Sequence, residues 1–297
     1  MKRSNKRKSK ADIVFIVFNT IALTLFCVIT LYPILNTLAV SLNEAVDTLT
    51  GGIHLIPRKF TLANYKSVFR MDTLMQGAYI SVLRTVIATT LHMILTSLLA
   101  YVLSRKEFLF NKQVSHFYVL TMYVSGGMIP GLLLLKNLGL TNSFWVYIIP
   151  GAISAYNMIV IRTYMNGLPE SLVESAQVDG AGHFRIFLRI IMPLCKPVLA
   201  TVALFIAVGQ WNAWFDVMIY NSGKPELTTL QYELMKLLSS VSNQSADPNA
   251  MKNASNMVTP ESIRAAATMI TAFPIVCLYP FLQRYFVSGL TIGGVKE

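Results

Sequence analysis

The chain has 297 residues, of which 54% are hydrophobic and only 13% are charged. A soluble domain of this length usually carries about 25% charged residues, so the composition argues against a soluble protein and indicates that lipid solvates much of the chain. The formal net charge of +11 is compatible with nucleic-acid binding, but the basic residues follow a membrane topology instead. Cys27, Cys195 and Cys277 are far apart and lie in or beside apolar segments, which predicts neither a disulfide nor a metal site.

Six long stretches of the chain contain no charged residue. They cover residues 13–40, 85–104, 113–135, 137–161, 197–215 and 265–283. A helix needs about 20 apolar residues to cross a hydrocarbon core of about 30 Å, and lipid offers no partner to an unpaired backbone. We therefore predict an all-α integral membrane fold with six transmembrane helices, near residues 12–41, 77–104, 113–136, 142–165, 195–219 and 262–287.

Several of these stretches contain proline, which breaks the helices of soluble proteins. Inside a membrane bundle a proline marks a kink instead, and we expect kinks at Pro33, Pro130, Pro150, Pro274 and Pro280. The first stretch is about twice as long as the apolar part of a cleaved signal peptide. We therefore expect it to be retained as a membrane anchor.

The basic residues predict the orientation of the helices. Six crossings put both termini on one side of the membrane. If that side is the cytoplasm, 15 of the 25 Lys and Arg residues lie in inner segments, as the positive-inside rule requires. The chain then begins with a basic cytoplasmic tail (1–12) held near anionic headgroups, followed by a first transmembrane helix with an outer loop (13–76). The core (77–287) contains an inner loop (164–196) and an outer loop (220–264). A cytoplasmic C-terminal tail (288–297) follows.

The inner loop has the pattern of two short helices. Pro169 stands where a helix can begin without its N–H, and Gly180 stands where a left-handed cap ends one. A second segment from Gly182 is expected to end at Pro193. Its apolar face is predicted to hold Phe184, Phe187, Leu188 and Ile191, and its basic face Arg185 and Arg189. Physical chemistry alone allows two interpretations: a hairpin lying on lipid headgroups, or a ridge that docks into a groove of another protein.

The spacing in this loop resembles a family motif. Glu174-Ser-Ala176 is followed by three residues, Gly180, nine residues, Ile190, one residue and Met192-Pro193. This is similar to the EAA loop of bacterial ABC importer permeases, whose pattern is E-A-A, three residues, G, nine residues, I, one residue and L-P. The chain departs from it at Ser175 and Met192, and both changes are mild.

The resemblance extends over most of the chain. Residues 284–297 are similar to the C-terminus of maltose-type (MalG-like) permeases. Residues 126–130, 209–214 and 227–232 resemble the branch that imports complex or uronate-containing oligosaccharides, the LplC- and YtcP-like permeases. The resemblance implies a type I ABC importer permease (MetI-like) architecture in the plasma membrane of a prokaryote, with an oligosaccharide as the transported substrate.

The resemblance also implies partners. In this family two permease chains pair, usually as a heterodimer, two ATPase subunits dock beneath them, and an extracellular solute-binding protein delivers the sugar. The residues expected to couple to the ATPase are Glu174, Ser175, Ala176, Asp179 and Gly180, with a further ATPase contact from Gly293, Gly294 and Lys296. The chain lacks a glycine-rich phosphate loop. We therefore expect it to be no enzyme and to hold no cofactor, metal or nucleic acid, with ATP and Mg²⁺ bound by the partner ATPase.

Residues of the fifth stretch are candidates for the sugar path. Oligosaccharides are held by aromatic rings and by planar polar groups with several donors and acceptors. The candidates are Gln210, Trp211, Asn212 and Trp214, with Tyr156 and Asn157 in the fourth stretch. Trp211 and Trp214 are predicted to share a helix face, and an aromatic belt at the outer membrane interface is the competing interpretation. We expect Arg84 and Asp216 at the interface, and His92 in a hydrogen bond within the bundle.

Other functions remain as alternatives. An ABC permease for a non-sugar solute would carry the same coupling loop. An ion-coupled transporter would need intramembrane carboxylates or ion sites at broken helices, and a membrane-embedded enzyme would need a catalytic set such as an activated Ser/His pair. The six charge-free stretches contain no acidic residue, which disfavours both.

Overall fold

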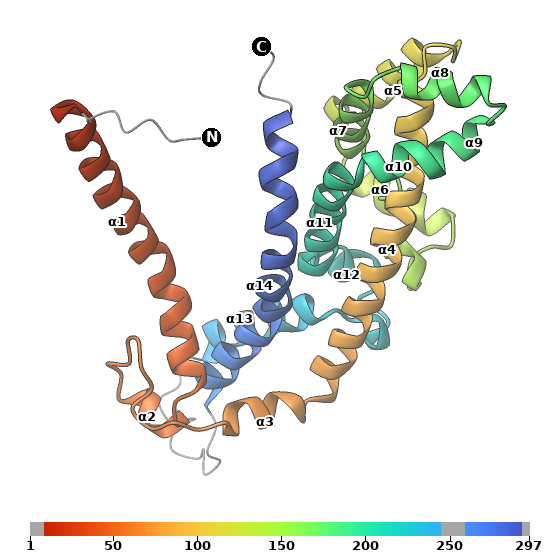
Figure 1. The fold of residues 1–297 in the computed structure, drawn as a ribbon. Helices are drawn as coiled ribbons and strands as arrows, with labels where there is room; N and C mark the ends of the chain where they lie inside the picture. Colours follow the sequence, from red (N-terminus) through yellow and green to blue (C-terminus); the bar gives the residue numbers. More distant parts are fainter. Residues whose placement is uncertain (1–8, 245–258, 293–297) are drawn as a thin grey trace. The chain divides into compact units, whose positions relative to one another are not determined.

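The computed structural model describes residues 9–244 and 259–292, and those residues are mostly helical (Figure 1). Between them they form no β-strand beyond a single bridge that joins Asn43 and Phe60. In chain order the α-helices are α1 (Lys10–Ser41), α2 (Ala45–Leu49), α3 (Ala63–Phe69), α4 (Asp72–Ser104), α5 (Asn111–Tyr123), α6 (Met128–Asn137), α7 (Ala155–Asn166), α8 (Ser171–Val178), α9 (His183–Ile186), α10 (Met192–Leu194), α11 (Lys196–Asn212), α12 (Phe215–Tyr220), α13 (Leu230–Gln244) and α14 (Pro260–Ile292). Short 3₁₀-helices η1 (Phe144–Tyr147) and η3 (Pro225–Leu227) and a π-helix η2 (Phe187–Ile191) connect them. The expected all-α class is confirmed.

The chain divides into two compact units. The first comprises Met1–Arg70 and Leu238–Ile270, and the second comprises Met71–Leu237 and Thr271–Glu297. The chain passes from one unit to the other between α3 and α4, within α13 and within α14.

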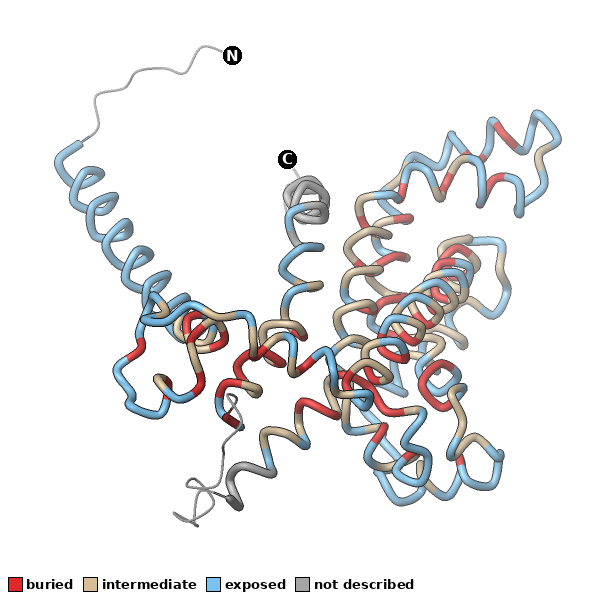
Figure 2. Tube along the Cα trace, turned by 90° about the horizontal axis from the view of Figure 1, so that it is seen from below, coloured by how far each residue is buried: buried red, intermediate tan, exposed pale blue. Residues whose placement is uncertain are grey.

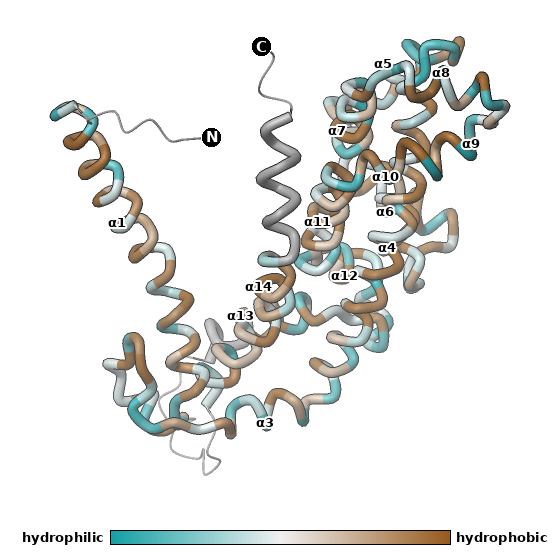
Figure 3. The backbone as a smooth tube through the Cα atoms, viewed as in Figure 1, coloured by the Kyte–Doolittle hydropathy of each residue, from teal (hydrophilic) through white to brown (hydrophobic). Residues whose placement is uncertain are grey.

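Helix α1 dominates the first unit. It is apolar on all sides, with a mean hydropathy of 2.5 over its most apolar 18-residue window, and none of that window is buried by the chain (Figures 2 and 3). A helix that is hydrophobic all round is stable only when lipid or another apolar surface covers it. The retained membrane anchor predicted from the sequence therefore has the form of one continuous helix, with Pro33 inside it.

The rest of the first unit begins with a short polar connection after α1. Asn64, which is fully buried, donates from Nδ2 to the carbonyl oxygens of Ser41 (2.9 Å) and Asn43 (2.8 Å). Asn43 in turn accepts a hydrogen bond from the backbone N–H of Lys59 (2.9 Å). These amides satisfy the buried backbone groups that a loop exposes when it packs, so α2 and α3 are fixed beside the end of α1.

The second unit is built around α4, which packs against α7 and α11. The side chains at the centre of this contact are almost inaccessible to solvent, and they include Leu103, Met158, Ile161 and Val202. The buried face of α4 carries small residues, among them Ser81, Ala88, Ser97 and Ala100. Small residues let helix backbones approach closely. In lipid the hydrophobic effect does not drive helices together, so this close van der Waals packing stabilises the bundle.

Three of the six predicted helices are not continuous. Residues 113–136 form α5 and α6, which meet at an angle of 119°, because Gly127 adopts φ +86° between them. Residues 142–165 hold only η1, an irregular stretch and the 12-residue α7, because Pro150-Gly151 interrupts the helical backbone. Residues 195–219 break after Asn212, where Ala213 is extended (ψ 125°).

The other three helices agree with their predicted ranges. α1 matches residues 12–41, α4 begins five residues before the predicted 77–104, and α14 extends past 262–287 at both ends. Within the described residues, three helices are long and apolar enough to cross a membrane, or up to five if each bent pair counts as one span. The predicted count of six transmembrane helices is therefore not confirmed exactly. The segment 220–264, expected as an outer loop, contains helix α13.

Gly77 marks a close approach between α4 and the chain just before α13. A Cβ at this position would lie 2.9 Å from both Leu230 N and Thr229 C, and the same segment is held by a 2.9 Å hydrogen bond from Leu230 N–H to Ser81 Oγ. Because backbone atoms cannot yield as a side chain can, Gly77→Ala is expected to lower the free energy of unfolding by about 1–3 kcal/mol. Thermal unfolding of the purified chain measures it.

Gly209→Ala is the matched control for this prediction. Gly209 lies in α11 and a Cβ there would meet nothing within 4 Å. The substitution is expected to leave stability unchanged or raise it by about 0.5–1 kcal/mol, since alanine favours a helix. Equal destabilisation by both changes would contradict the close approach at Gly77.

Candidate functional site

The inner loop folds as a short helix held against the bundle. α8 places Val173 and Ala176 in the main core, where they are 5% and 8% exposed, together with Ile186 and Ile191. The opposite side of the helix is open, and Glu174 and Ser175 are exposed on it. The two faces follow from the 3–4 spacing of Val173 and Ala176, so α8 is anchored by one face and offers the other to a partner.

The end of α8 explains why glycine stands at position 180. Gly180 has φ +77°, its N–H donates to the carbonyl of Gln177 (2.9 Å), and the N–H of Ala181 donates to the carbonyl of Ala176 (2.9 Å). This pair of bonds is a Schellman cap, which satisfies the last carbonyls of a helix and requires the left-handed backbone that glycine tolerates. The predicted glycine turn is confirmed.

The second helix of the loop differs from its predicted amphipathic face. Ile186, Phe187 and Ile191 are buried, whereas Phe184 (67%) and Leu188 (48%) are exposed. Leu188 lies in the π-helical turn η2, whose period is wider than that of the regular helix assumed in the prediction. Phe184 lies before this turn, on α9. The helix ends at Leu194, one residue after Pro193, and the chain then bends by 83° into α11, so the predicted end agrees to within one residue.

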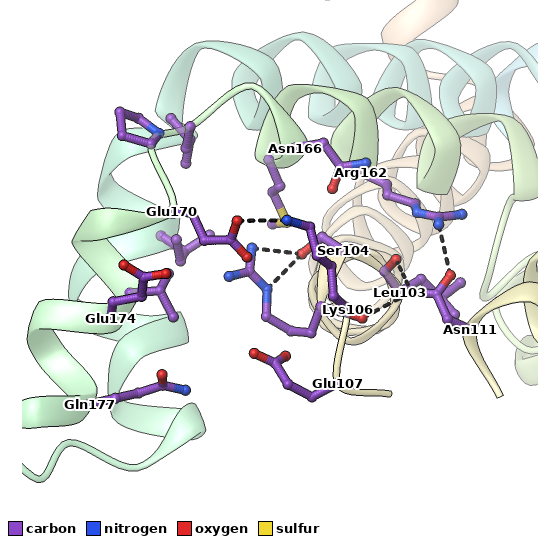
Figure 4. Close-up of a pocket in the computed structure, with 16 residues that line it drawn as sticks. Leu103, Ser104, Lys106, Glu107, Asn111, Arg162, Asn166, Glu170, Glu174 and Gln177 are labelled. Atoms are coloured by element: carbon purple, nitrogen blue, oxygen red, sulfur yellow. Dashed lines mark hydrogen bonds and ion pairs between the residues drawn. The ribbon is translucent and has the colours of Figure 1, made fainter. Parts of the chain in front are cut away.

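A polar cavity of about 390 Å³ lies beside α8 (Figure 4). It is lined by Leu103–Glu107 at the end of α4, Asn111 of α5, the C-terminal part of α7, and Glu170, Glu174 and Gln177 on and next to α8. The cavity therefore joins the expected coupling helix to the C-terminal ends of α4 and α7 and the N-terminal end of α5. Residues of both charges line it: Arg105, Lys106 and Arg162 are basic, and Glu107, Glu170 and Glu174 are acidic.

Two contacts organise this cavity. Lys106 Nζ lies 2.7 Å from Glu170 Oε2, and this hydrogen-bonded pair raises the pKa of Lys106 and lowers the pKa of Glu170 (Figure 4). Both side chains are exposed, so the pair contributes little to stability. Arg162 donates to Ser115 Oγ (2.7 Å) and Asn111 Oδ1 (2.8 Å), which ties α7 to α5.

The structure brings the five expected coupling residues together on α8 and its cap. Glu174, Ser175, Asp179 and Gly180 are exposed. Ala176 is turned into the chain's own core instead, so it supports the helix rather than facing a partner. Gly293, Gly294 and Lys296, the expected C-terminal contacts, lie outside the described residues.

The candidates for the sugar path do not form one surface. Gln210 accepts a 2.6 Å hydrogen bond from Arg84 Nε, and Trp211 Nε1–H donates to the carbonyl of Thr271 on α14 (2.9 Å). Both side chains are therefore engaged inside the bundle. The prediction that Trp211 and Trp214 share a helix face is wrong, because α11 ends at Asn212, before Trp214.

The remaining candidates differ in exposure. Asn212 is exposed, Trp214 is half-buried, and Tyr156 is 55% exposed, whereas Asn157 is buried. Asn212, Trp214 and Tyr156 are thus the candidates that the chain leaves accessible. His92 is buried and its Nε2 lies 2.8 Å from the carbonyl oxygen of Ile148, which confirms the expected hydrogen bond.

One contact was missed by sequence reasoning. Arg84, expected at the interface, is only 3% exposed and forms an ion pair with Asp216. Its guanidinium also lies over the Tyr147 ring, 4.5 Å from the centroid. The sequence contained a signal for this ion pair. Arg84 and Asp216 carry opposite charges, and each lies in an otherwise apolar part of a predicted span.

The comparisons with known proteins agree with this architecture. A family model described as "Binding-protein-dependent transport system inner membrane component" matches residues 4–292. The chain belongs to this family. Among its relatives, the polygalacturonan/rhamnogalacturonan transport system permease protein YtcP of Bacillus subtilis (strain 168) is 34% identical over 275 residues, covering 92% of this chain and 95% of that protein. Protein LplC of the same strain is 36% identical over 291 residues and 97% of each chain.

A solved structure shares the fold. In the crystal structure of a bacterial ABC transporter involved in the import of the acidic polysaccharide alginate, one chain matches with a TM-score of 0.86 and 25% identity, over 95% of this chain and 100% of that chain. The expected permease fold and the resemblance to the LplC- and YtcP-like branch are therefore confirmed. The chain is therefore a membrane permease of a binding-protein-dependent ABC importer, and its relatives of this kind are named for oligosaccharide transport.

Proposed function

We propose that the chain is one of two membrane subunits of an importer for an acidic oligosaccharide, driven by ATP hydrolysis in partner subunits. One observation carries the proposal: the segment with the family motif folds as the exposed helix α8. Val173 and Ala176 anchor this helix in the core, and Gly180 ends it with a positive φ. Such a helix suits docking into a groove of a partner. YtcP, at 34% identity, is named for polygalacturonan/rhamnogalacturonan, and the solved transporter imports the acidic polysaccharide alginate. AraQ, GanQ and MdxG, at 28–30% identity, are named for arabinooligosaccharides, galactooligosaccharides and maltodextrin. The higher identity to YtcP favours an acidic glycan.

In this proposal the parts of the chain have distinct roles. Glu174 and Ser175 contact the ATPase, which holds ATP and Mg²⁺, and α8 passes the motion of the ATPase to α4 and α7 as a rigid-body shift. A second permease chain covers part of the exposed apolar surface of α1. A solute-binding protein delivers the oligosaccharide to the outer side, where Asn212, Trp214 and Tyr156 are accessible.

The substrate is tested by isolating the transporter with its solute-binding protein. The glycan bound to that protein is released and identified by mass spectrometry. We expect an oligosaccharide that contains uronic acid. A non-sugar solute would overturn the substrate assignment while leaving the ABC permease assignment intact, because the coupling loop would be the same.

The proposed orientation is tested by cysteine labelling. In a chain whose native cysteines are replaced by serine, Ser175→Cys is expected to react with a membrane-impermeant maleimide only after the cell is opened, since α8 then lies in the cytoplasm. Ser222→Cys, exposed in the outer loop, serves as the control and is expected to react in intact cells. Reaction of Ser175→Cys in intact cells would invert the topology.

A further inference from the structure

The buried pair of Arg84 and Asp216 joins two helices far apart in the chain. Arg84 lies twenty positions before Ser104, the end of α4, and Asp216 lies twenty positions after Lys196, the start of α11. At 1.5 Å per residue Arg84 is roughly 30 Å from the inner end of α4, and Asp216 lies on α12 just past the outer end of α11. This length matches the hydrocarbon core, so the pair belongs to the outer side of the bundle under the proposed topology.

Arg84 contacts both sides of the break between α11 and α12. Its Nε donates to Gln210 Oε1 (2.6 Å) before the break, and its Nη1 approaches the Ala213 carbonyl within the break (3.5 Å). Nη1 and Nη2 together bind both carboxylate oxygens of Asp216 after the break, with Nη1 3.2 Å from Oδ1. One side chain of α4 therefore holds three successive points of another span.

The break needs such a partner. Ala213 leaves the helix with ψ 125°, and the backbone carbonyls at the end of α11 lose their helical partners there. A planar guanidinium has five donors in a fixed fork, which an ammonium group cannot reproduce. Tyr147 also holds the guanidinium in place, because that group lies over its aromatic ring. The Tyr147 ring is itself fixed, since its OH donates to the Leu227 carbonyl (2.7 Å).

We infer that Arg84 is a positioning residue for transport: it fixes the break between α11 and α12, and with it the place of Asn212 and Trp214 at the outer end of the path. The inference rests on the proposed function for its consequence in transport. Arg84 itself is too buried to bind a glycan, at 3% exposure, and all of its donors in this network face the protein. Asn212 and Trp214 flank the break directly and are accessible.

The geometry is tested with a spin label in the complete transporter, in lipid nanodiscs. The label is attached at Asn212→Cys after the native cysteines are replaced. With Arg84 present, we expect a slowly tumbling label, and with Arg84→Met a label that tumbles at least threefold faster. Arg84→Lys is expected to give an intermediate tumbling rate. This variant still tests the inference if Arg84→Met does not fold.

Arg162→Met is the matched control. It removes a different arginine of the same unit, which is partly buried and whose partners are Ser115 and Asn111 rather than the break. It is expected to leave the label unchanged. An unchanged label in both Arg84→Met and Arg84→Lys would overturn the inference, as would an equal effect of Arg162→Met.

The transport consequence is measured separately. Arg84→Lys is expected to slow uptake by about 10²-fold, the effect of a roughly 1 Å misplacement of positioning groups, while the ATPase still copurifies with the permease. Uptake at the unchanged rate would overturn the inference. If the unmodified transporter imports no oligosaccharide but the label responds to Arg84 substitution, the proposed function fails and the positioning role of Arg84 stands.

Discussion

Loss of sugar uptake is the expected result of Glu174→Ala, with normal insertion of the chain into the membrane. Glu174 is exposed on α8, so its removal leaves no buried cavity and costs the chain little stability. In the docked complex the carboxylate would be desolvated against the ATPase, where truncation of one charged partner costs about 2–5 kcal/mol. This range corresponds to at least a tenfold weaker docking. Copurification of the ATPase and ATP-dependent uptake measure the effect.

Gly180→Val is expected to give the same loss by a different route. At φ +77° an L-residue is strained by about 1–2 kcal/mol, and a β-branched side chain is worse. The Schellman cap then opens and the exposed face of α8 points elsewhere. A Cβ at Gly180 would meet nothing within 4 Å, so a steric clash cannot explain the loss.

The chain offers matched controls for both substitutions. Gly180→Ala and Gly182→Ala add the same methyl group in open space, but Gly182 has φ −69°. Only the first is expected to reduce coupling. Glu170→Ala removes a carboxylate engaged with Lys106 at the start of α8 and is expected to be mild. Full uptake and normal ATPase copurification in both Glu174→Ala and Gly180→Val would contradict the coupling role of the loop. The loop would then be interpreted as a hairpin that lies on the lipid headgroups.

The second large effect is expected on stability. Arg84→Met leaves Asp216 without its ion-pair partner inside the bundle, and breaking such a pair costs about 3–5 kcal/mol. The side chain of Asp216 is 24% exposed, so partial hydration moves the cost toward the lower end of this range. Thermal unfolding of the purified transporter in detergent measures the loss.

The double variant Arg84→Met/Asp216→Leu separates a charge penalty from a packing penalty. Replacing both partners of a buried pair by apolar residues is often neutral or stabilising, so the double variant is expected to regain most of the stability. It would not regain the geometry of the break, because no donor then reaches Gln210 or Ala213. A double variant less stable than Arg84→Met would contradict the ion-pair explanation.

Sequence reasoning succeeded where a local pattern decides the structure. α1, α4 and α14 follow from long apolar runs, and the cap at Gly180 follows from the spacing of the inner loop. It failed where one residue interrupts an apolar run. The absence of charge over residues 113–135 says nothing of Gly127, whose positive φ turns the chain by 119° between α5 and α6.

The missed features of the site have two physical causes. The face of the second inner helix was assigned with a regular period of 3.6 residues. The π-turn at Phe187–Ile191 changes that period, and Leu188, which lies within the turn, is exposed. Arg84 and Asp216 are 132 positions apart. No periodicity reports a contact at that separation, so only the packing of α4 against α11 brings them together.

Reconstitution tests the proposed function most directly. The permease, its partner permease and the ATPase are placed in proteoliposomes with the solute-binding protein and a labelled uronate oligosaccharide. We expect uptake only when ATP and the binding protein are both present, and no uptake with Glu174→Ala. Uptake that follows an ion gradient without ATP, or that persists undiminished in Glu174→Ala, would contradict coupling through α8.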